Sequence, residues 1–293
     1  MSDRARSAKS PRRFSCLLFT TLWACGFGVS TSRAQDAKPS DADAKASATT
    51  AKKKARPSTK SRRTRAYPPG TYMGRPIADV MSWEGAEWLV RETREQEEQP
   101  DAMLDALKIP AGAVVADVGA GVGYNSLRMS RRVGPKGVVY ATDVQPQMLQ
   151  MLRARMKEAG VANVRPIRST PGDPKLPENA LDLILMVDVY HEFSEPDVML
   201  QGLRRALKPG GRIVFVEFRA EDPDVPIKPE HKMTLAQVKR EVVPQGFVFQ
   251  TSLEFLPWQH IIVFEKPKSE TEPKPASASP PLGAPIKEPK KAG

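Results

Sequence analysis

Three glycines spaced two residues apart follow a short apolar run that contains an acid. The run covers residues 114–118 and includes Asp117; the glycines are Gly119, Gly121 and Gly123, with Ala120 between the first two. Glycine has no Cβ, so its backbone can approach a ligand closely and adopt unusual φ and ψ. The segment therefore predicts a buried parallel strand that leads into a ligand-binding turn, with a helix starting at about Asn125.

A second acid follows the next apolar run. Asp143 ends the run 138–143 and lies 20 residues past Gly123, the distance expected for one strand–helix unit. Its carboxylate can accept two hydrogen bonds from the vicinal hydroxyls of a ribose, next to Val144. The alternative is a helix-capping acid, since Pro146 opens the next expected helix. The glycine turn and Asp143 together favour a nucleoside site.

Groups capable of acid–base chemistry follow a third apolar run, residues 181–187. They are Asp188, Tyr190, His191 and Glu192. A histidine with an ordinary pKa near ~6.5 suits a general base, so His191 is the first catalytic candidate. Asp188 is the second, and it is also a candidate contact for cofactor or substrate. The alternative for His191 is a structural role, capping the next helix or bonding a carbonyl.

The other histidines, His231 and His260, have no metal-ligand spacing with each other or with His191. We therefore expect surface or packed histidines and no metal site.

Four ordered motifs between about Ala102 and Glu265 resemble the class I S-adenosylmethionine (SAM)-dependent methyltransferases. The first is the G-x-G-x-G turn that follows Asp117, and the second is Asp143 itself. The third is the polar segment after residue 187, and the fourth is the L-K-P-G-G turn at residues 207–211. The general likeness is to the ubiquinone/menaquinone C-methyltransferase-like group. The resemblance implies SAM as the cofactor and methyl transfer to an acceptor that is small or lipid-like.

The same resemblance implies an α/β fold, a Rossmann-like seven-stranded, mostly parallel sheet with a terminal antiparallel hairpin and helices on both faces. The expected strands cover 114–118, 138–143, 164–167, 181–187, 213–218, 246–255 and 260–264, with helices between the first five.

An adenine contact is expected in the loop after residue 167. In the family, an acid four residues before a Leu-Pro pair meets the adenine amino group. Here the pair is Leu176-Pro177, the matching position is Gly172, and the acid Asp173 stands one place later. Either Asp173, Thr170 or a backbone group is expected to make this contact. The full cofactor set is Asp117, Gly119, Ala120, Gly121, Gly123, Asp143, Val144, Thr170, Asp173 and Asp188.

Residues 67–101 precede the expected methyltransferase domain, 102–265. Within them, residues 77–99 resemble one or two amphipathic helices, the second ended by Pro100. In the family such an extension covers the cofactor, which makes Trp83, Trp88 and Arg91 candidate lid residues. A helix packed on the sheet edge is the alternative.

The positive charge of the chain belongs to its ends. Residues 1–34, 35–66 and 266–293 carry net charges of +5, +7 and +3, so residues 67–265 hold −4 of the total of +11. This distribution does not favour a specific nucleic-acid site, although the basic tails could touch anionic surfaces. Residues 35–66 and the tail 266–293 are expected to be disordered because they have few large apolar side chains. The oligomeric state cannot be predicted.

Residues 1–34 have the pattern of an export signal. A basic start precedes the apolar run 16–30, and small residues at 32 and 34 predict cleavage before Gln35. Cleavage would remove Cys16 and Cys25, leaving no thiol for a disulfide, a metal or a nucleophile. We therefore expect a periplasmic or envelope-associated protein. The alternative is an uncleaved membrane anchor, and either way SAM would have to reach the protein from the cytosol.

Two other function classes remain open. The first is a non-catalytic protein that binds SAM or another nucleoside on the same fold, which the displaced Asp173 favours. The second is an NAD-dependent dehydrogenase, but its third fingerprint glycine would fall at position 124, where this chain has Tyr124.

Overall fold

The structure, a computed structural model, describes residues 67–269. The expected signal peptide, the basic linker and the tail beyond residue 269 lie outside the described residues. Within the described part, the helices are too short or too polar to cross a bilayer.

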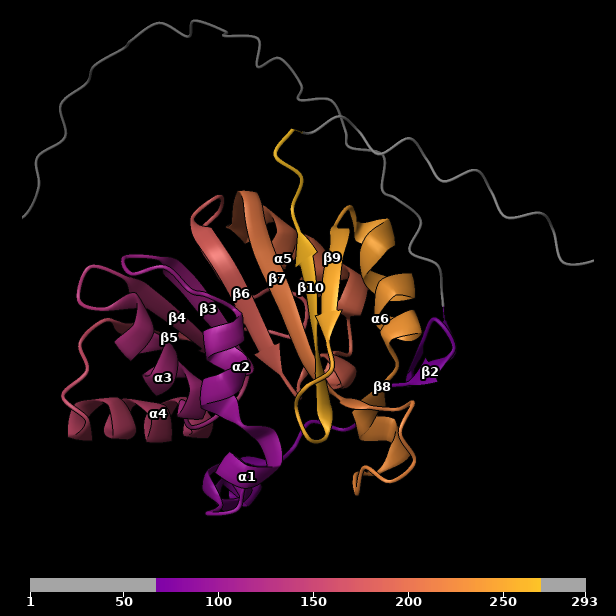
Figure 1. Ribbon diagram of the computed structural model, residues 1–293, viewed down its shortest axis with the longest axis horizontal. Helices are drawn as coiled ribbons and strands as arrows, with labels where there is room; N and C mark the ends of the chain where they lie inside the picture. Colours follow the sequence, from indigo (N-terminus) through magenta and orange to yellow (C-terminus); the bar gives the residue numbers. More distant parts are fainter. Residues whose placement is uncertain (1–66, 270–293) are drawn as a thin grey trace, which may run out of the picture. The chain divides into compact units, whose positions relative to one another are not determined.

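An eight-stranded sheet forms the centre of the described chain, in the order β5-β4-β3-β6-β7-β10-β9, with β8 paired to β7 (Figure 1). Its strands are β3 (Val114–Val118), β4 (Val138–Asp143), β5 (Val164–Arg168), β6 (Leu181–Val187), β7 (Leu207–Arg219), β8 (Lys232–Met233), β9 (Val248–Leu253) and β10 (Gln259–Glu265). Only the pairs of β10 with β7 and β9 are antiparallel within this sheet. The expected mostly parallel sheet with a terminal antiparallel hairpin is confirmed.

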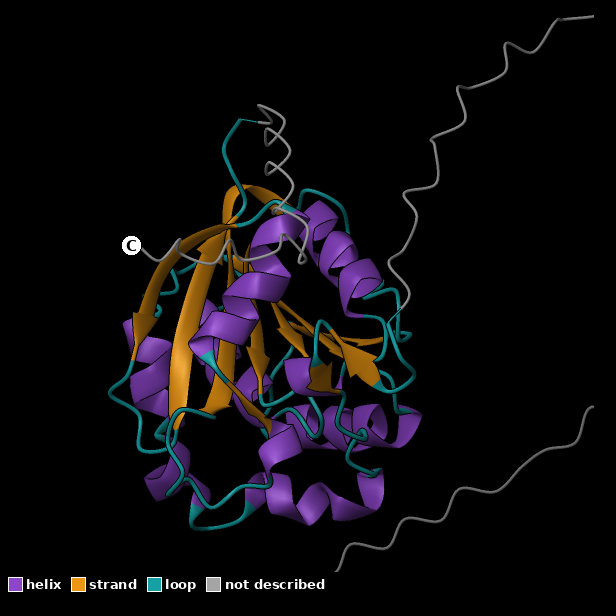
Figure 2. Ribbon diagram, turned by 90° about the vertical axis from the view of Figure 1, so that its right-hand side faces the viewer, coloured by secondary structure: helices purple, strands orange, loops and turns teal. Residues whose placement is uncertain are grey.

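Both faces of this sheet are buried, which explains why its strands are apolar almost throughout. Side chains alternate between the faces, so Val115 and Leu183 join one core layer while Ala116 and Ile184 join the other. The first layer packs against α2 (Pro100–Ala106), α3 (Tyr124–Val133) and α4 (Pro146–Glu158), and the second against α5 (Pro196–Ala206) and α6 (Leu235–Val242). Figure 2 shows these helices around the strands.

Several elements differ from the expectations. The segment 169–180 between β5 and β6 contains no helix, and β7 begins at Leu207 instead of residue 213. In β7 the glycine-rich stretch 208–211 bulges from the ladder, because Leu207 pairs with Leu181 and Arg212 pairs with Leu183. The strand β8 and the small hairpin of β1 (Thr71–Tyr72) and β2 (Arg75–Pro76) carry too few residues to show a period.

The segment before the domain consists of short helices. They are η1 (Trp83–Val90) and α1 (Arg94–Glu98), followed at once by α2; η2 (Tyr190–Glu192), η3 (Pro229–His231) and η4 (Val243–Gln245) lie later in the chain. One or two helices were expected here, the second ended by Pro100; instead, Pro100 is the first residue of α2. This position suits proline, because the first turn of a helix has no use for its missing N–H.

The order of the strands fixes where a ligand can bind. β3 lies between β4 and β6, so the chain leaves β3 toward one side of the sheet and reaches β6 on the other. In open α/β sheets a crevice forms at such a switch point, beyond the carboxyl ends of the strands. The loops after β3, β4 and β6 begin with Gly119, Val144 and Asp188, so the motifs singled out in the sequence meet there.

Candidate functional site

A cavity of about 750 Å³ opens at this switch point. Its walls come from the loops after β3, β4, β5 and β6, from the segment 79–98, and from residues 226–231. Such a volume lies in the range of ligand pockets, ~300–1,000 Å³.

The glycine turn forms one wall. Gly119 and Gly121 both line the cavity and have positive φ values of 71° and 52°. A Cβ at Gly119 would lie 2.3 Å from Val189, and one at Gly121 would lie 2.6 Å from Leu89. The turn therefore requires glycine both for its backbone conformation and for space.

The next residues of this motif have a different task. Gly123 lies outside the cavity lining, caps the start of α3 with φ of 79°, and would place a Cβ 2.8 Å from Leu152. Ala120 is buried and is also absent from the lining. These two residues shape the turn and pack the helix behind it.

Asp143 lines the cavity next to the glycine turn. Its Oδ2 accepts a hydrogen bond from the Gly121 N–H at 2.9 Å, and its Oδ1 accepts one from the Gln145 N–H at 2.8 Å. Burial raises its pKa, and these backbone donors act against that rise. Both interpretations of the sequence thus apply in part, because the carboxylate binds backbone near the start of α4 and also faces the cavity. Val144 lines the cavity as well.

Asp117 lies beneath the turn and outside the cavity lining. Its Oδ2 accepts a hydrogen bond from the Ser126 hydroxyl at 2.6 Å, which ties β3 to the first turn of α3. Burial raises its pKa to about 6, against the lowering effect of Ser126 and Arg94. Asp117 therefore positions the glycine turn.

This pKa predicts a pH-dependent stability. The folded protein holds a proton on Asp117 up to about pH 6, whereas an exposed aspartate loses it near ~3.9. The contribution of Asp117 to stability is therefore lost as the pH rises through that window. We expect the unfolding free energy of the native protein, minus that of Asp117→Asn, to fall between pH 4 and pH 7. Urea unfolding of both proteins at pH 4 and at pH 7 measures this difference in unfolding free energy. The same difference at both pH values would contradict a raised pKa of the buried Asp117 carboxyl.

The loop after β5 contributes different residues from those expected. Asp173 is half-exposed, forms an ion pair with Lys175 at 2.7 Å and accepts a hydrogen bond from its backbone N–H. Thr170 pairs through its backbone with Asp173. Neither Asp173 nor Thr170 lines the cavity, which is instead bordered by Ser169 and Pro171. Asp173 turns away because its carboxylate is satisfied at the surface by the lysine two residues on.

Asp188 lines the cavity at the end of β6 in a strained conformation, with φ of 51°. Its Oδ2 accepts a hydrogen bond from the Gln259 side-chain amide at 2.6 Å, while Oδ1 is buried and has no partner among the described residues. Burial, together with the charges of Glu98 and Glu217, raises its pKa well above the ordinary range. A strained, half-satisfied carboxyl group at a cavity wall is typical of a ligand-binding position.

The expected lid packs over the glycine turn. Ala86 of η1 is buried against Val122 and Met148, and Leu89 packs beside them. The side chain of Gln145 fastens the same segment, since it accepts from the Trp83 N–H at 2.9 Å and donates to the Met81 carbonyl at 2.9 Å. The segment thus covers the glycine turn.

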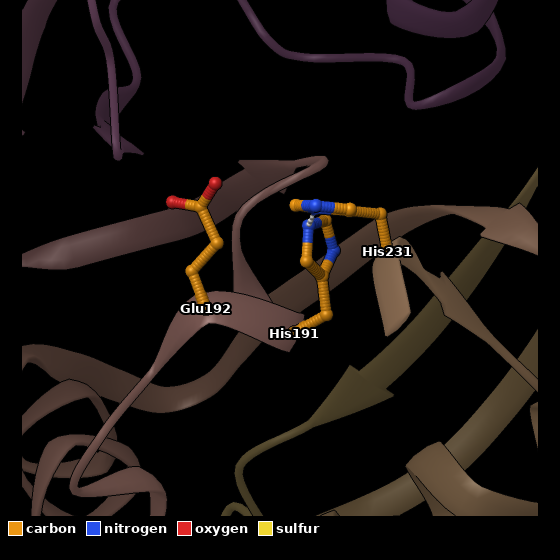
Figure 3. A group of neighbouring side chains, drawn as sticks. All are labelled: His191, Glu192 and His231. Atoms are coloured by element: carbon orange, nitrogen blue, oxygen red, sulfur yellow. Dashed lines mark hydrogen bonds between the residues drawn. The ribbon is translucent and has the colours of Figure 1, made fainter. Parts of the chain in front are cut away.

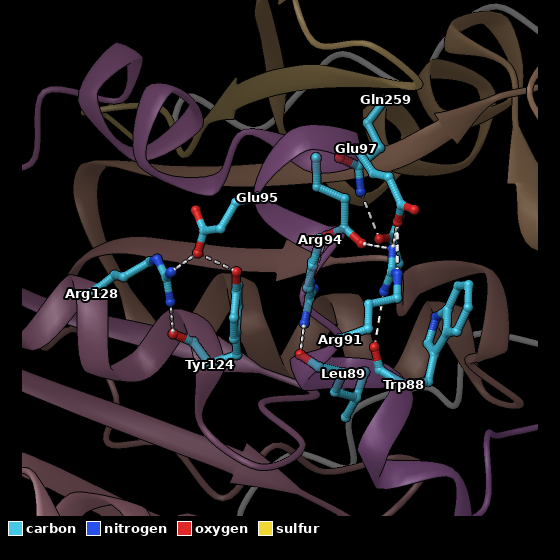
Figure 4. A network of polar contacts seen from close by, with 11 residues as sticks. Trp88, Leu89, Arg91, Arg94, Glu95, Glu97, Tyr124, Arg128 and Gln259 are labelled. Carbon is cyan, nitrogen blue, oxygen red and sulfur yellow. Dashed lines mark hydrogen bonds and ion pairs between the residues drawn. The ribbon is translucent and has the colours of Figure 1, made fainter.

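Two arginines hold the end of this lid (Figure 4). Arg91 stacks on Trp88, with 3.8 Å from its guanidinium carbon to the ring centroid, and Arg94 lies over Tyr124 at 4.3 Å. Both arginines pair with Glu98 at 2.8 Å. Trp88 and Arg91 line the cavity as expected, whereas the Trp83 side chain is absent from the lining.

His191 also lines the cavity and is almost fully buried. Its Nδ1 lies 2.6 Å from the Glu217 Oε2, and its Nε2 lies 3.1 Å from the Nδ1 of His231. Burial opposes charge on His191, but the Glu217 carboxylate outweighs it and raises the pKa. Burial and the neighbouring His191 lower the pKa of His231.

Two neighbours of His191, His231 and Glu217, could not be placed beside it from the sequence. His231 was expected to be a surface or packed histidine. It follows His191 by 40 residues, so no local spacing connects them, but the fold places the two rings in contact. Glu217 did leave a signal, since a carboxylate within the apolar run 213–218 must find a buried partner. His260 is packed, as expected, and is outside the cavity lining.

Comparison with known proteins agrees with this architecture. Residues 115–211 match the sequence model of a methyltransferase domain. The ubiquinone/menaquinone biosynthesis C-methyltransferase of Idiomarina loihiensis is 30% identical over 116 residues, which are 39% of this chain and 46% of that protein. The chain thus spans about half the length of the curated relatives it matches.

Solved structures share the fold. A SAM-dependent methyltransferase from Aquifex aeolicus matches with a TM-score of 0.61 and 27% identity, covering 64% of this chain and 100% of that one. The [4+2]-cyclase SpnF matches with a TM-score of 0.51 and 17% identity over 58% of this chain and 80% of that one, a likeness of fold alone. These comparisons confirm the Rossmann-like methyltransferase fold and support a methyltransferase domain with SAM as its cofactor.

Proposed function

We propose that this protein is a SAM-dependent methyltransferase whose acceptor is a small, largely apolar, quinone-like molecule. The observation that carries the proposal is the cavity itself. Part of its lining is a glycine turn and a carboxylate suited to a nucleoside, which we call the nucleotide end. The part with apolar side chains and a polar corner at His191 is called the acceptor end. The methyltransferase-domain match over residues 115–211 supports the same activity.

The residues at the nucleotide end fit SAM. Gly119 and Gly121 line the cavity in a turn that only glycine allows, because a Cβ would collide with Val189 or Leu89. Asp143 retains lone pairs that can accept from ribose hydroxyls. The buried, unpartnered Oδ1 of Asp188 suits a positively charged group of the ligand, whose charge would favour the ionised carboxylate. SAM would supply an activated methyl group.

The acceptor end determines the kind of molecule that could be methylated. Phe193, Met199, Phe218 and Ile227 contribute apolar side chains to the wall. Such a surface favours an aromatic or lipid-like acceptor over a charged one. The name of the matching C-methyltransferases suggests a quinone or its reduced form, and this substrate is part of the proposal.

The protein's own chemical task is alignment, exclusion of water and, where the acceptor atom carries a proton, removal of that proton. His191 and Asp188 are the groups that we propose for this last task, because both line the cavity. The lid segment would help to exclude water, since η1 covers the glycine turn.

Calorimetric titration of the full-length chain with SAM and with S-adenosylhomocysteine tests the donor site. We expect micromolar binding of both and none of NADH. A reduced naphthoquinone without its ring methyl group, incubated with radiolabelled SAM, then tests transfer. A folded chain that binds neither nucleoside overturns the proposal. Binding without transfer to any quinol of this class would instead indicate the non-catalytic binding protein.

A further inference from the structure

The polar corner of the cavity is built from three side chains on two short helices. His191 and Glu192 belong to η2, and His231 ends η3 (Figure 3). One ligand atom from each of the three lies within 4.8 Å of the others. We infer that these residues form a binding site for a divalent transition-metal ion such as Zn²⁺.

The spacing of the two imidazoles fits a shared metal ion. Nitrogen ligands lie about 2.0–2.1 Å from Zn²⁺, so two of them at tetrahedral or right angles are roughly 2.9–3.4 Å apart. The Nε2 of His191 and the Nδ1 of His231 are 3.1 Å apart. Two histidines and one carboxylate are also a ligand set that catalytic metal sites use, with open positions left for water or substrate.

His191 is oriented as a metal ligand from behind. Glu217 is fully buried, and its Oε2 lies 2.6 Å from the Nδ1 of His191 while its Oε1 accepts from the Tyr190 N–H at 2.9 Å. A carboxylate on one ring nitrogen fixes the tautomer and leaves the lone pair on the other, the arrangement that supports metal-bound histidines. The backbone is fixed too, because the His191 carbonyl accepts from Arg75 at 3.0 Å and from Ala78 at 3.1 Å.

The same two rings could instead share a proton, His231 donating to His191. The position of Glu192 favours a metal ion over a shared proton between the two rings. Its carboxylate is partly buried and accepts from the Met81 N–H at 3.3 Å, which leaves lone pairs available at the corner where the two histidines meet. A proton-sharing pair has no need of a third ligand, whereas a metal ion does.

The site faces the acceptor end of the cavity, since all three residues line it. This use of the metal rests on the proposed function. In the metal-bound protein Asp188 alone would accept the proton, because the lone pair of His191 would bind the metal ion. An oxygen atom of the acceptor could occupy an open coordination position, where the metal ion would orient it and lower the pKa of its hydroxyl group. The metal-binding property itself does not depend on SAM.

Cobalt titration of the full-length chain tests the inference. Cys16→Ser and Cys25→Ser are introduced first, because these two are the only cysteines of the chain and their thiolates would compete. After removal of metals with a chelator, we expect one equivalent of Co²⁺ to produce visible d–d absorption, and Zn²⁺ to abolish it. His231→Asn and Glu192→Gln should each weaken Co²⁺ binding at least tenfold.

Two control variants leave the three ligands intact. His260→Asn removes the one remaining histidine of the chain, and Glu230→Gln removes a carboxylate beside His231 in sequence. Both should bind Co²⁺ like the parent protein, with circular dichroism to verify folding. Absence of Co²⁺ binding in the folded parent, or an equal loss in a control, overturns the metal site and leaves a proton-sharing pair. Failure to bind SAM with Co²⁺ binding intact would contradict only the proposed function.

Discussion

Replacing Gly121 by valine is expected to abolish SAM binding in a protein that keeps its secondary structure. Gly121 has φ of 52°, where a β-branched residue is strained, and its Cβ would lie 2.6 Å from the lid residue Leu89. The added side chain would therefore push the lid outward and occupy the space beside the glycine turn. We expect Kd for SAM to rise at least ~100-fold, which corresponds to about 2.7 kcal/mol.

Gly160→Val is the matched control for this experiment. Gly160 also has a positive φ, of 65°, but an added Cβ would meet nothing within 4 Å, and the residue lies at the end of α4 outside the cavity lining. Both variants carry the backbone strain, but only Gly121→Val places a side chain against Leu89 at the cavity wall. Calorimetry with SAM should separate them, and equal affinities would refute the role of the turn.

The central sheet could be predicted because its evidence is local. The strands β3, β4 and β6 are short apolar runs that end at, or are followed by, an acid or a glycine, as β4 ends at Asp143. This pattern needs no knowledge of distant residues. The strand β8 could not be predicted, since two residues, Lys232 and Met233, have no period. The helix expected after β5 is absent for a different reason. That expectation came from the family pattern and not from the residues of the segment itself.

The site divides in the same way. Gly119, Gly121, Asp143 and Asp188 stand at strand ends, so their meeting follows from the order of parallel strands. The contact of His231 with His191 depends instead on how the segment after β7 folds back onto the sheet. The spacing of the two histidines in the sequence does not indicate this contact.

Burial also separates residues that look equivalent in the sequence. Asp117 and Asp173 are both acids beside the nucleotide motifs. The first is buried beneath the turn and accepts a hydrogen bond from Ser126, while the second is half-exposed and paired with Lys175. Their roles could not be assigned without the packing.

Asp143→Ala is expected to weaken SAM binding by about 1–3 kcal/mol, because the ribose hydroxyls would lose a buried acceptor. In affinity this is a rise in Kd of roughly 5- to 150-fold. The control is Asp182→Ala, which removes a carboxylate that also accepts a backbone N–H, from Val114 at 2.8 Å, but at the amino end of β6. Calorimetry of the control should give the parent affinity, and an unchanged affinity in Asp143→Ala would contradict the ribose contact.

Asp143 also holds the glycine turn through the Gly121 N–H, so a weaker Kd could arise from a loosened turn alone. A ligand without the hydroxyls separates these causes. If Asp143 contacts the ribose, the alanine variant should lose much of its affinity for S-adenosylhomocysteine but little for the 2′,3′-dideoxy analogue, which has no hydroxyl to be left unpaired. If the carboxylate only supports the turn, both ligands should weaken by the same factor, because both contact the same backbone.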